Sequence, residues 1–146
     1  MTLVSLSSLS ARARPPELAV SWRQAEICNW GQFCRDVAAV SRRVAGCQRG
    51  VLSCRDSYWF AVGLFALMTA GAVVVLPPNT QPGTLAALAA EGATVVMDEG
   101  SGAIQGMAEG GGSWVANLIT EQCRLEFLTS GSTGTPKRIT RTLTEL

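Results

Sequence analysis

The sequence predicts an α/β domain with a largely parallel sheet and helices on both faces. Short, almost continuously apolar segments alternate with longer segments of helical periodicity. Strands that are apolar on both sides are typical of parallel sheets, whose crossover helices cover both faces. The chain has 146 residues, 47% of them hydrophobic and 16% charged, which suffices for the core of one domain. We expect this domain over residues 17–146, after an N-terminal extension over 1–16 that we expect to be mobile.

The first predicted elements are a short strand and an amphipathic helix. Residues 18–22 form a short apolar stretch, and a polar link follows through Glu26. Asn29 can cap a helix because its side-chain oxygen can accept a backbone N–H of the first turn. The apolar residues that follow are spaced as on one helical face and end near Gly46: Phe33, Val37, Val40 and Val44.

The middle of the chain alternates between predicted strands and helices. We expect strands over 51–54, 72–76 and 93–97, and helices over 57–69 and 83–90. Six of the thirteen residues over 100–112 are glycine, which predicts a mobile glycine-rich loop or linker. Residues 114–119 form another short apolar element, and 125–128 a strand that runs into a Gly/Ser/Thr-rich segment.

One apolar stretch is long enough to raise the question of a membrane span. Residues 58–76 are 19 strongly apolar residues, the length that crosses a bilayer. However, Gly71 is typical of a helix end, and the following 72–76 are mostly β-branched and stop at Pro77. We therefore predict a buried helix, a turn and a strand, and no membrane span.

Composition excludes several classes of function. The chain has no histidine, which removes imidazole metal sites and histidine general bases. Its net charge is +1 without a basic run, so we expect no nucleic-acid partner. The five cysteines are not spaced C-x-x-C, and residues 1–16 lack a secretory apolar core, so we expect a cytoplasmic protein with mostly buried, reduced thiols. A disulfide or a reactive thiol is the alternative.

The segment 129–137, TSGSTGTPK, carries the groups that a polyphosphate needs. Glycines let backbone N–H groups approach phosphate oxygens, hydroxyls donate hydrogen bonds, and Lys137, the only lysine of the chain, supplies a compact charge. It is not a Walker A loop, because Pro136 and not glycine precedes the lysine. A polar surface turn is the other interpretation of such a composition.

The string Leu128 to Lys137 resembles the phosphate-binding loop of the AMP-forming adenylating enzymes, such as acyl-CoA synthetases, aryl and fatty-acid AMP ligases and adenylation domains. Residues 70–79 resemble that family's helix end, strand and proline-containing turn. Residues 30–44 resemble its early helix. One departure is Arg138, where the family commonly has glycine. Lipid- and polyene-type synthetases are the more similar members. The resemblance implies ATP with Mg²⁺, and these cofactor-binding residues: Thr129, Ser130, Gly131, Ser132, Thr133, Gly134 and Lys137.

The resemblance also implies what the chain does. It would be a truncated N-terminal part of a carboxylate ligase that forms an acyl-adenylate and then a thioester with coenzyme A or a carrier-protein thiol. The family's catalytic residues lie beyond the loop, so we expect inactivity of the chain alone and assign neither catalytic residues nor metal ligands. The alternatives are half of a split enzyme with a separate C-terminal partner, and a stand-alone nucleotide-binding module.

Overall fold

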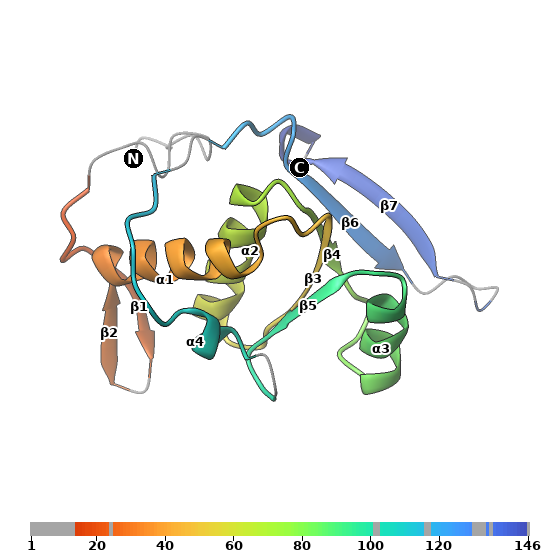
Figure 1. Cartoon of the computed structure of the whole chain (residues 1–146), viewed down its shortest axis with the longest axis horizontal. Helices are drawn as coiled ribbons and strands as arrows, with labels where there is room; N and C mark the ends of the chain where they lie inside the picture. Colours follow the sequence, from red (N-terminus) through yellow and green to blue (C-terminus); the bar gives the residue numbers. More distant parts are fainter. Residues whose placement is uncertain are drawn as a thin grey trace.

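The computed structural model describes residues 14–23, 25–100, 103–115, 118–129, 134 and 136–145 (Figure 1). Within these residues a two-stranded hairpin, β1–β2, precedes a five-stranded sheet of order β5-β3-β4-β6-β7. The strands are β1 (Ala19–Arg23), β2 (Glu26–Asn29), β3 (Arg49–Ser53), β4 (Val73–Leu76), β5 (Thr94–Met97), β6 (Arg124–Thr129) and β7 (Lys137–Thr142). The helices are α1 (Trp30–Arg43), α2 (Ser57–Thr69), α3 (Pro82–Ala90), α4 (Ile104–Met107) and the 3₁₀ turn η2 (Leu143–Glu145).

The main sheet is largely parallel, as predicted. Strand β3 pairs in parallel with both β4 and β5, and β4 pairs in parallel with β6. Only the last strand, β7, runs antiparallel to its neighbour β6. The connection through α2 leads from β3 to β4, and the connection through α3 leads back past β3 to β5. Because crossovers keep one hand, reversing their direction puts the two helices on opposite faces.

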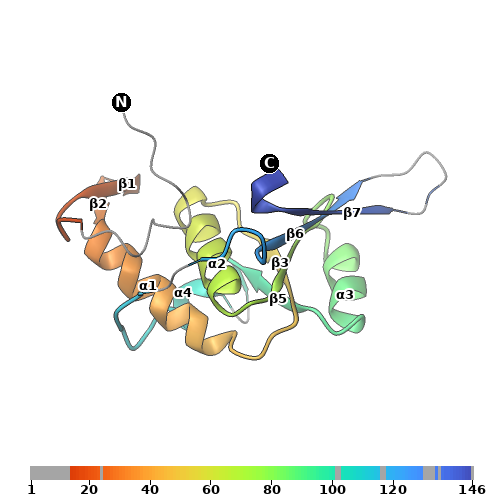
Figure 2. The same cartoon turned by 90° about the horizontal axis from the view of Figure 1, so that it is seen from above.

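Alternate residues of the strands bury two separate apolar clusters, one on each face of the sheet. Leu52 and Val74 pack in the larger cluster, to which α1 and α2 contribute. Val51 and Val75 point the other way and pack with residues of α3. Figure 2 shows α1 and α2 on one side of the sheet and α3 on the other. The predicted cover of both faces is therefore confirmed.

Local capping explains where the two long helices begin. The Asn29 side chain accepts the Gln32 N–H at 2.9 Å, so α1 begins as predicted, and its apolar face is buried. Asp56 accepts the N–H groups of Tyr58 and Trp59 at the start of α2. Helix α2 is followed by Gly71, whose φ of 73° suits glycine, and then by β4. Among the described residues no helix is long and apolar enough to cross a membrane.

Three elements differ from the pattern expected over their residues. Strand β2 begins at Glu26, the last residue of the expected polar link, and covers residues for which no strand was predicted; its pairing with β1 satisfies its backbone. Strand β7 follows the Gly/Ser/Thr-rich segment, where no strand was predicted. Within the segment expected to be a glycine-rich loop, α4 forms because Ile104 is fully buried against the core. Later in the same segment, Arg42 donates a hydrogen bond to the Gly111 carbonyl oxygen. All five cysteines are free thiols.

Candidate phosphate-binding site

Two antiparallel strands hold the ends of the predicted phosphate-binding segment. Thr129 is the last residue of β6 and Lys137 the first of β7, and the two are cross-strand partners at the end of the ladder. The Thr129 hydroxyl lies 3.5 Å from the Lys137 carbonyl oxygen. The segment thus follows the carboxyl end of a parallel strand, which is where α/β sheets commonly bind ligands.

The structure describes only part of the segment itself. Gly134 has a φ of 80°, a conformation that glycine adopts without strain. Gly134, Pro136 and Lys137 are all exposed. The other predicted site residues lie outside the described residues: Ser130, Gly131, Ser132 and Thr133.

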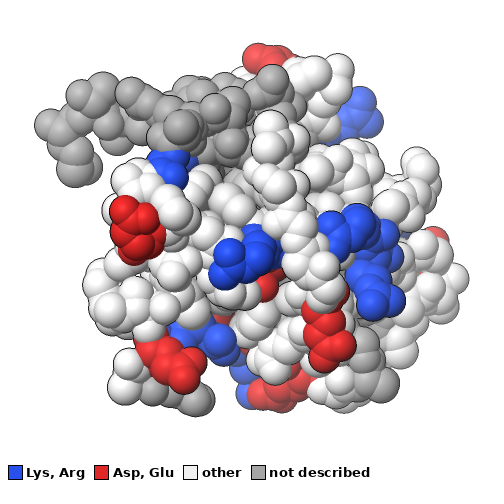
Figure 3. Space-filling view, turned by 60° about the vertical axis from the view of Figure 1, so that its left-hand side comes forward, with Lys and Arg blue, Asp and Glu red and all other residues white. Residues whose placement is uncertain are grey.

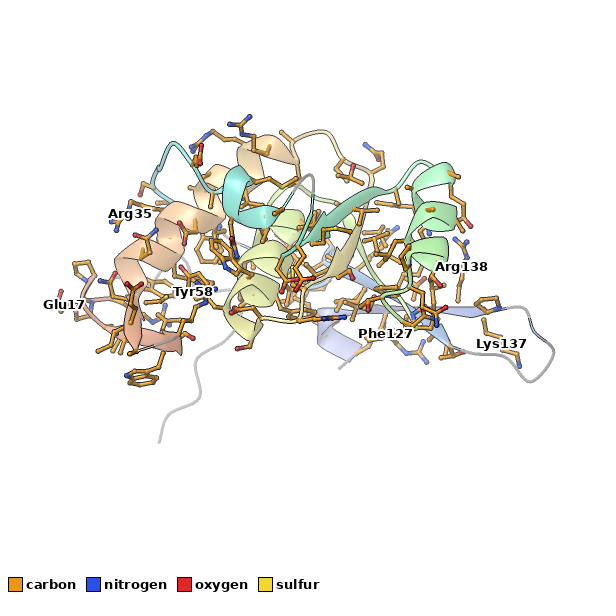
Figure 4. All side chains as sticks on the ribbon, turned by 90° about the horizontal axis from the view of Figure 1, so that it is seen from below. Glu17, Arg35, Tyr58, Phe127, Lys137 and Arg138 are labelled. Atoms are coloured by element: carbon orange, nitrogen blue, oxygen red, sulfur yellow. The ribbon has the colours of Figure 1, made fainter. Side chains whose placement is uncertain are left out.

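Lys137 and Arg138 extend to opposite faces of the sheet, because successive strand residues alternate. Arg138 lies beside α3, whereas Lys137 lies near the end of the β6–β7 hairpin (Figure 4). Among the described residues, no carboxylate lies within ion-pair distance of Lys137. Arg138, by contrast, makes ion pairs with Glu91 and Glu126. At the end of the hairpin that carries the predicted loop, Lys137 is therefore available to an anion, whereas the charge of Arg138 is neutralised.

The arginines also affect the ionisation of Glu91. Hydrogen bonds from Arg138 and then Arg49 hold the pKa of Glu91 below its ordinary value. The hydrogen bond to Glu91 in turn raises the pKa of Arg138. Glu91 and Arg138 therefore stay charged at neutral pH and neutralise one another.

The start of α2 is a second place to consider for an anion, because helix N-termini carry partial positive charge. That position already holds a carboxylate, since Asp56 caps the helix and also bonds Arg23 at 2.9 Å. Asp98 accepts the N–H groups of Arg55 and Asp56 at 2.7 and 2.8 Å. These carboxylates disfavour a phosphate at α2 and leave the β6–β7 hairpin as the candidate site.

Sequence reasoning missed two groups of polar side chains. In one, Asp36 is buried and accepts hydrogen bonds from Tyr58 at 2.6 Å and Gln32 at 2.7 Å. Burial, and then the hydrogen bond to Asp36, raise the pKa of Tyr58 far above its ordinary value. The other group contains Glu126. The sequence did hold a signal for it, because Glu126 is a charged residue inside an otherwise apolar predicted strand, and a charged side chain requires a partner when it is buried.

Basic and acidic side chains are interspersed on the face shown in Figure 3. This pattern agrees with the net charge of +1, which provides no broad positive field for a polyanion. Anion binding would therefore depend on local contacts at the hairpin.

No group of three or more Cys, Asp or Glu side chains that could hold a metal ion occurs among the described residues.

The chain is similar in structure to adenylation proteins. The N-terminal subdomain of NpsA from Klebsiella oxytoca, in complex with 3-hydroxybenzoyl-AMSN, aligns with a TM-score of 0.64 and 18% identity. The ATP-bound RpMatB-BxBclM chimera B3 aligns with a TM-score of 0.67 and 18% identity. NpsA-ThdA from the same Klebsiella species, an artificially fused adenylation–PCP di-domain, aligns with a TM-score of 0.60 and 20% identity.

These alignments include most of this chain but a minor part of each neighbour. They cover 87%, 94% and 87% of this chain, and 37%, 34% and 30% of the respective neighbours. No protein-family model matches the chain, and a comparison of its sequence with curated proteins found no match. The chain therefore has the fold of part of an N-terminal adenylation subdomain, as the resemblance of its motifs predicted.

Proposed function

We propose that the chain supplies the ATP phosphate-binding loop of an AMP-forming acyl or aryl carboxylate ligase. The observation that carries the proposal is the position of the motif 129–137. It lies between β6 and β7, at the carboxyl end of a parallel strand, in a fold shared with adenylation subdomains. One neighbour of this fold is described as ATP-bound and another as bound to 3-hydroxybenzoyl-AMSN.

In this proposal the residues of the loop hold and orient the triphosphate of ATP. Lys137 places its ammonium group against phosphate oxygens as a point charge. Gly131 and Gly134 allow the backbone N–H groups to approach those oxygens closely. Hydroxyl donors complete the contacts: Thr129, Ser130, Ser132 and Thr133.

The reaction that such a loop would serve is transfer of AMP to a carboxylate. A carboxylate oxygen of the acid forms a bond to the α-phosphorus, the bond from that phosphorus to the bridging oxygen breaks, and pyrophosphate leaves. The thiol of coenzyme A or of a carrier protein then displaces AMP to give a thioester. Fixed positive charge near the leaving pyrophosphate stabilises the charge that develops there. The resemblance implies magnesium, but no group of three or more acidic or cysteine side chains that could hold it occurs among the described residues, so we assign it no step.

We further propose that the carboxylate and thiol sites require protein beyond these 146 residues. The chain aligns with 37% of the NpsA subdomain, so most of that subdomain has no counterpart here. Those parts would come from the same polypeptide or from a separate partner chain. The chain alone would then bind triphosphate without forming an adenylate.

Calorimetric titration with inorganic tripolyphosphate and with ATP tests the proposal on the native chain and on Lys137→Ala. We expect the variant to bind both about tenfold more weakly, because one charge-assisted contact at an exposed site contributes about 1.5 kcal/mol. Arg141→Ala is the matched control. Arg141 is an exposed cation on the same face of β7, about 14 Å from Lys137 at the strand repeat of about 3.4 Å.

The control separates a local contact from the effect of overall charge. We expect Arg141→Ala to bind both ligands like the native chain. Equal binding by the native chain and Lys137→Ala would contradict the role of the loop. An equal loss in both variants would show that the anions respond only to net charge.

A further inference from the structure

We propose that Arg138 is a positioning residue that fixes β7, and with it Lys137, by joining the carboxylates of Glu126 and Glu91. This inference rests on the proposed phosphate-binding function of the loop. It concerns the position at which this chain departs from the glycine of the adenylating enzymes that it resembles. Arg138 would touch neither substrate nor phosphate, and would act through the strand that carries Lys137.

The contacts form a closed cluster of four charges, Arg49, Glu91, Glu126 and Arg138, which we name the Arg138 cluster. Glu126 Oε1 accepts from Arg49 Nη2 at 2.8 Å and from Arg138 Nη1 at 3.4 Å. Glu91 Oε2 accepts from Arg49 Nη1 at 3.3 Å and also from Arg138 Nη2. Each carboxylate therefore binds both arginines, and the cluster joins β3, the C-terminal end of α3, β6 and β7.

Glu126 gives the cluster its strength. This residue is 8% exposed, in the middle of β6, whereas Arg138 lies at the surface with 44% of its side chain exposed. A carboxylate at a buried position is costly unless cations pair with it. Releasing Arg138 would leave Glu126 with Arg49 as its one cationic partner. Because a buried carboxylate is stabilised by each cation that pairs with it, the contact with Glu126 holds Arg138 in place.

Strand β7 has little else to anchor it. Five of its six residues are exposed, and it lies at the edge of the sheet next to β6. Hydrophobic burial, which fixes β3 and β4, therefore contributes little to the position of β7. Near Lys137, at the start of the strand, the backbone ladder with β6 and the Arg138 cluster hold it, whereas at its other end Thr142 donates to Glu145.

The cluster also specifies the register of the strand. Arg138 is paired with Leu128, on the face where α3 packs, and Lys137 is paired with Thr129 on the opposite face. A slip of one residue would exchange the two faces and place Lys137 near Glu126 and Glu91. Arginine is favoured at the cluster because its planar guanidinium can bond two carboxylates at once, whereas an ammonium is a point charge. Lys137 is thereby kept away from these carboxylates and available to an anion.

Amide hydrogen exchange measured by NMR on the full chain tests whether Arg138 holds β7. In Arg138→Ala we expect the β7 amides to exchange on the order of tenfold faster, with the amides of β3 and β4 unchanged. Glu126→Gln should loosen β7 in the same way, and the double variant should add little, because both substitutions break the same cluster. Arg141→Ala, which removes a charge from the same strand outside the cluster, should exchange like the native chain.

Tripolyphosphate binding, measured at a temperature where all variants are folded, tests the link to the loop. We expect Arg138→Ala to bind about threefold to tenfold more weakly. Arg138→Lys should recover only part of the loss, because lysines at both 137 and 138 would no longer specify which of the two residues faces Glu126 and Glu91. A merely structural role would leave this affinity unchanged in the folded protein.

The outcomes separate this inference from the proposed function. Unchanged β7 exchange in Arg138→Ala, or an equal acceleration of all amides, would overturn the positioning role. So would loosened β7 amides with native affinity for tripolyphosphate. If the native chain binds no tripolyphosphate, the proposed function fails, and the positioning of Lys137 for phosphate fails with it, while the exchange data still decide whether Arg138 anchors β7.

Discussion

Replacing Gly50 by alanine tests how closely α2 approaches the sheet. Gly50 lies in β3, and a Cβ added there would be 2.2 Å from Cδ2 and 2.8 Å from Cδ1 of Leu67. Ordinary contacts of this kind are 3.4 Å or longer. Leu67 is fully buried in α2, so its side chain cannot move aside without disturbing the core.

The expected magnitude follows from two opposing effects. Overpacking of a core typically costs about 1–3 kcal/mol, whereas replacing glycine in a strand recovers about 0.5–1 kcal/mol of backbone entropy. The balance is a destabilisation of about 1–2 kcal/mol. For a domain of this size that corresponds to a fall in Tm of about 3–8 °C.

Thermal unfolding followed by circular dichroism measures the effect, with Gly83→Ala as the matched control. Gly83 lies in α3, and an added Cβ would meet no atom within 4 Å. This control should be neutral or more stable by up to about 1 kcal/mol, since alanine favours the helix.

A second variant examines the contact itself. Leu67→Ala alone should cost about 2–5 kcal/mol, and Gly50→Ala should cost less in its presence because the clash is relieved. Gly50→Ala at native stability, or strictly additive losses in the double variant, would refute the proposed close approach of α2 and β3.

Two further predictions concern buried and capping polar groups. Tyr58→Phe removes one of the two donors to the buried Asp36, so we expect a loss of about 1–3 kcal/mol in urea unfolding at pH 7, and a native unfolding midpoint would contradict it. Burial opposes ionisation of Asp56, but hydrogen bonds from Trp59, Arg23 and Tyr58 lower its pKa below the ordinary value. A lowered carboxyl pKa stabilises the fold above the unfolded-state value of about 3.9 and ceases to do so as the pH falls through the folded-state value. Asp56→Ala should therefore cost about 1 kcal/mol at pH 7 and less below about pH 4, and a difference independent of pH would refute this account.

Local patterns were enough to predict most helices and the parallel strands. The spacing of Phe33, Val37 and Val40 predicted α1 because a helical face repeats every 3.6 residues, and those residues are buried. The division of the apolar stretch 58–76 into a helix and a strand followed from Gly71 and the β-branched run after it. These signals are local because capping, periodicity and turn conformation involve residues within a few positions of one another.

Strand β7 could not be predicted in this way. Its sequence, KRITRT, is polar and exposed, and it becomes a strand only because β6 provides a partner for its backbone. Strand β2, which was not predicted either, likewise pairs its backbone with a neighbouring strand, β1. Edge strands carry little hydrophobic pattern of their own, since only one side of their backbone is paired and their side chains need not enter the core.

The sequence by itself determined the fold class, the principal helices and the string 129–137 from which the phosphate-binding site is predicted. Only the tertiary structure decided the strand order, the antiparallel pairing of Thr129 with Lys137, and the contacts that separate Arg138 from its neighbour. The Arg138 cluster joins residues 12 to 77 positions apart in the chain. Such pairs form because folding removes a carboxylate from water and places it beside cations from other elements, and no local pattern records which elements will meet.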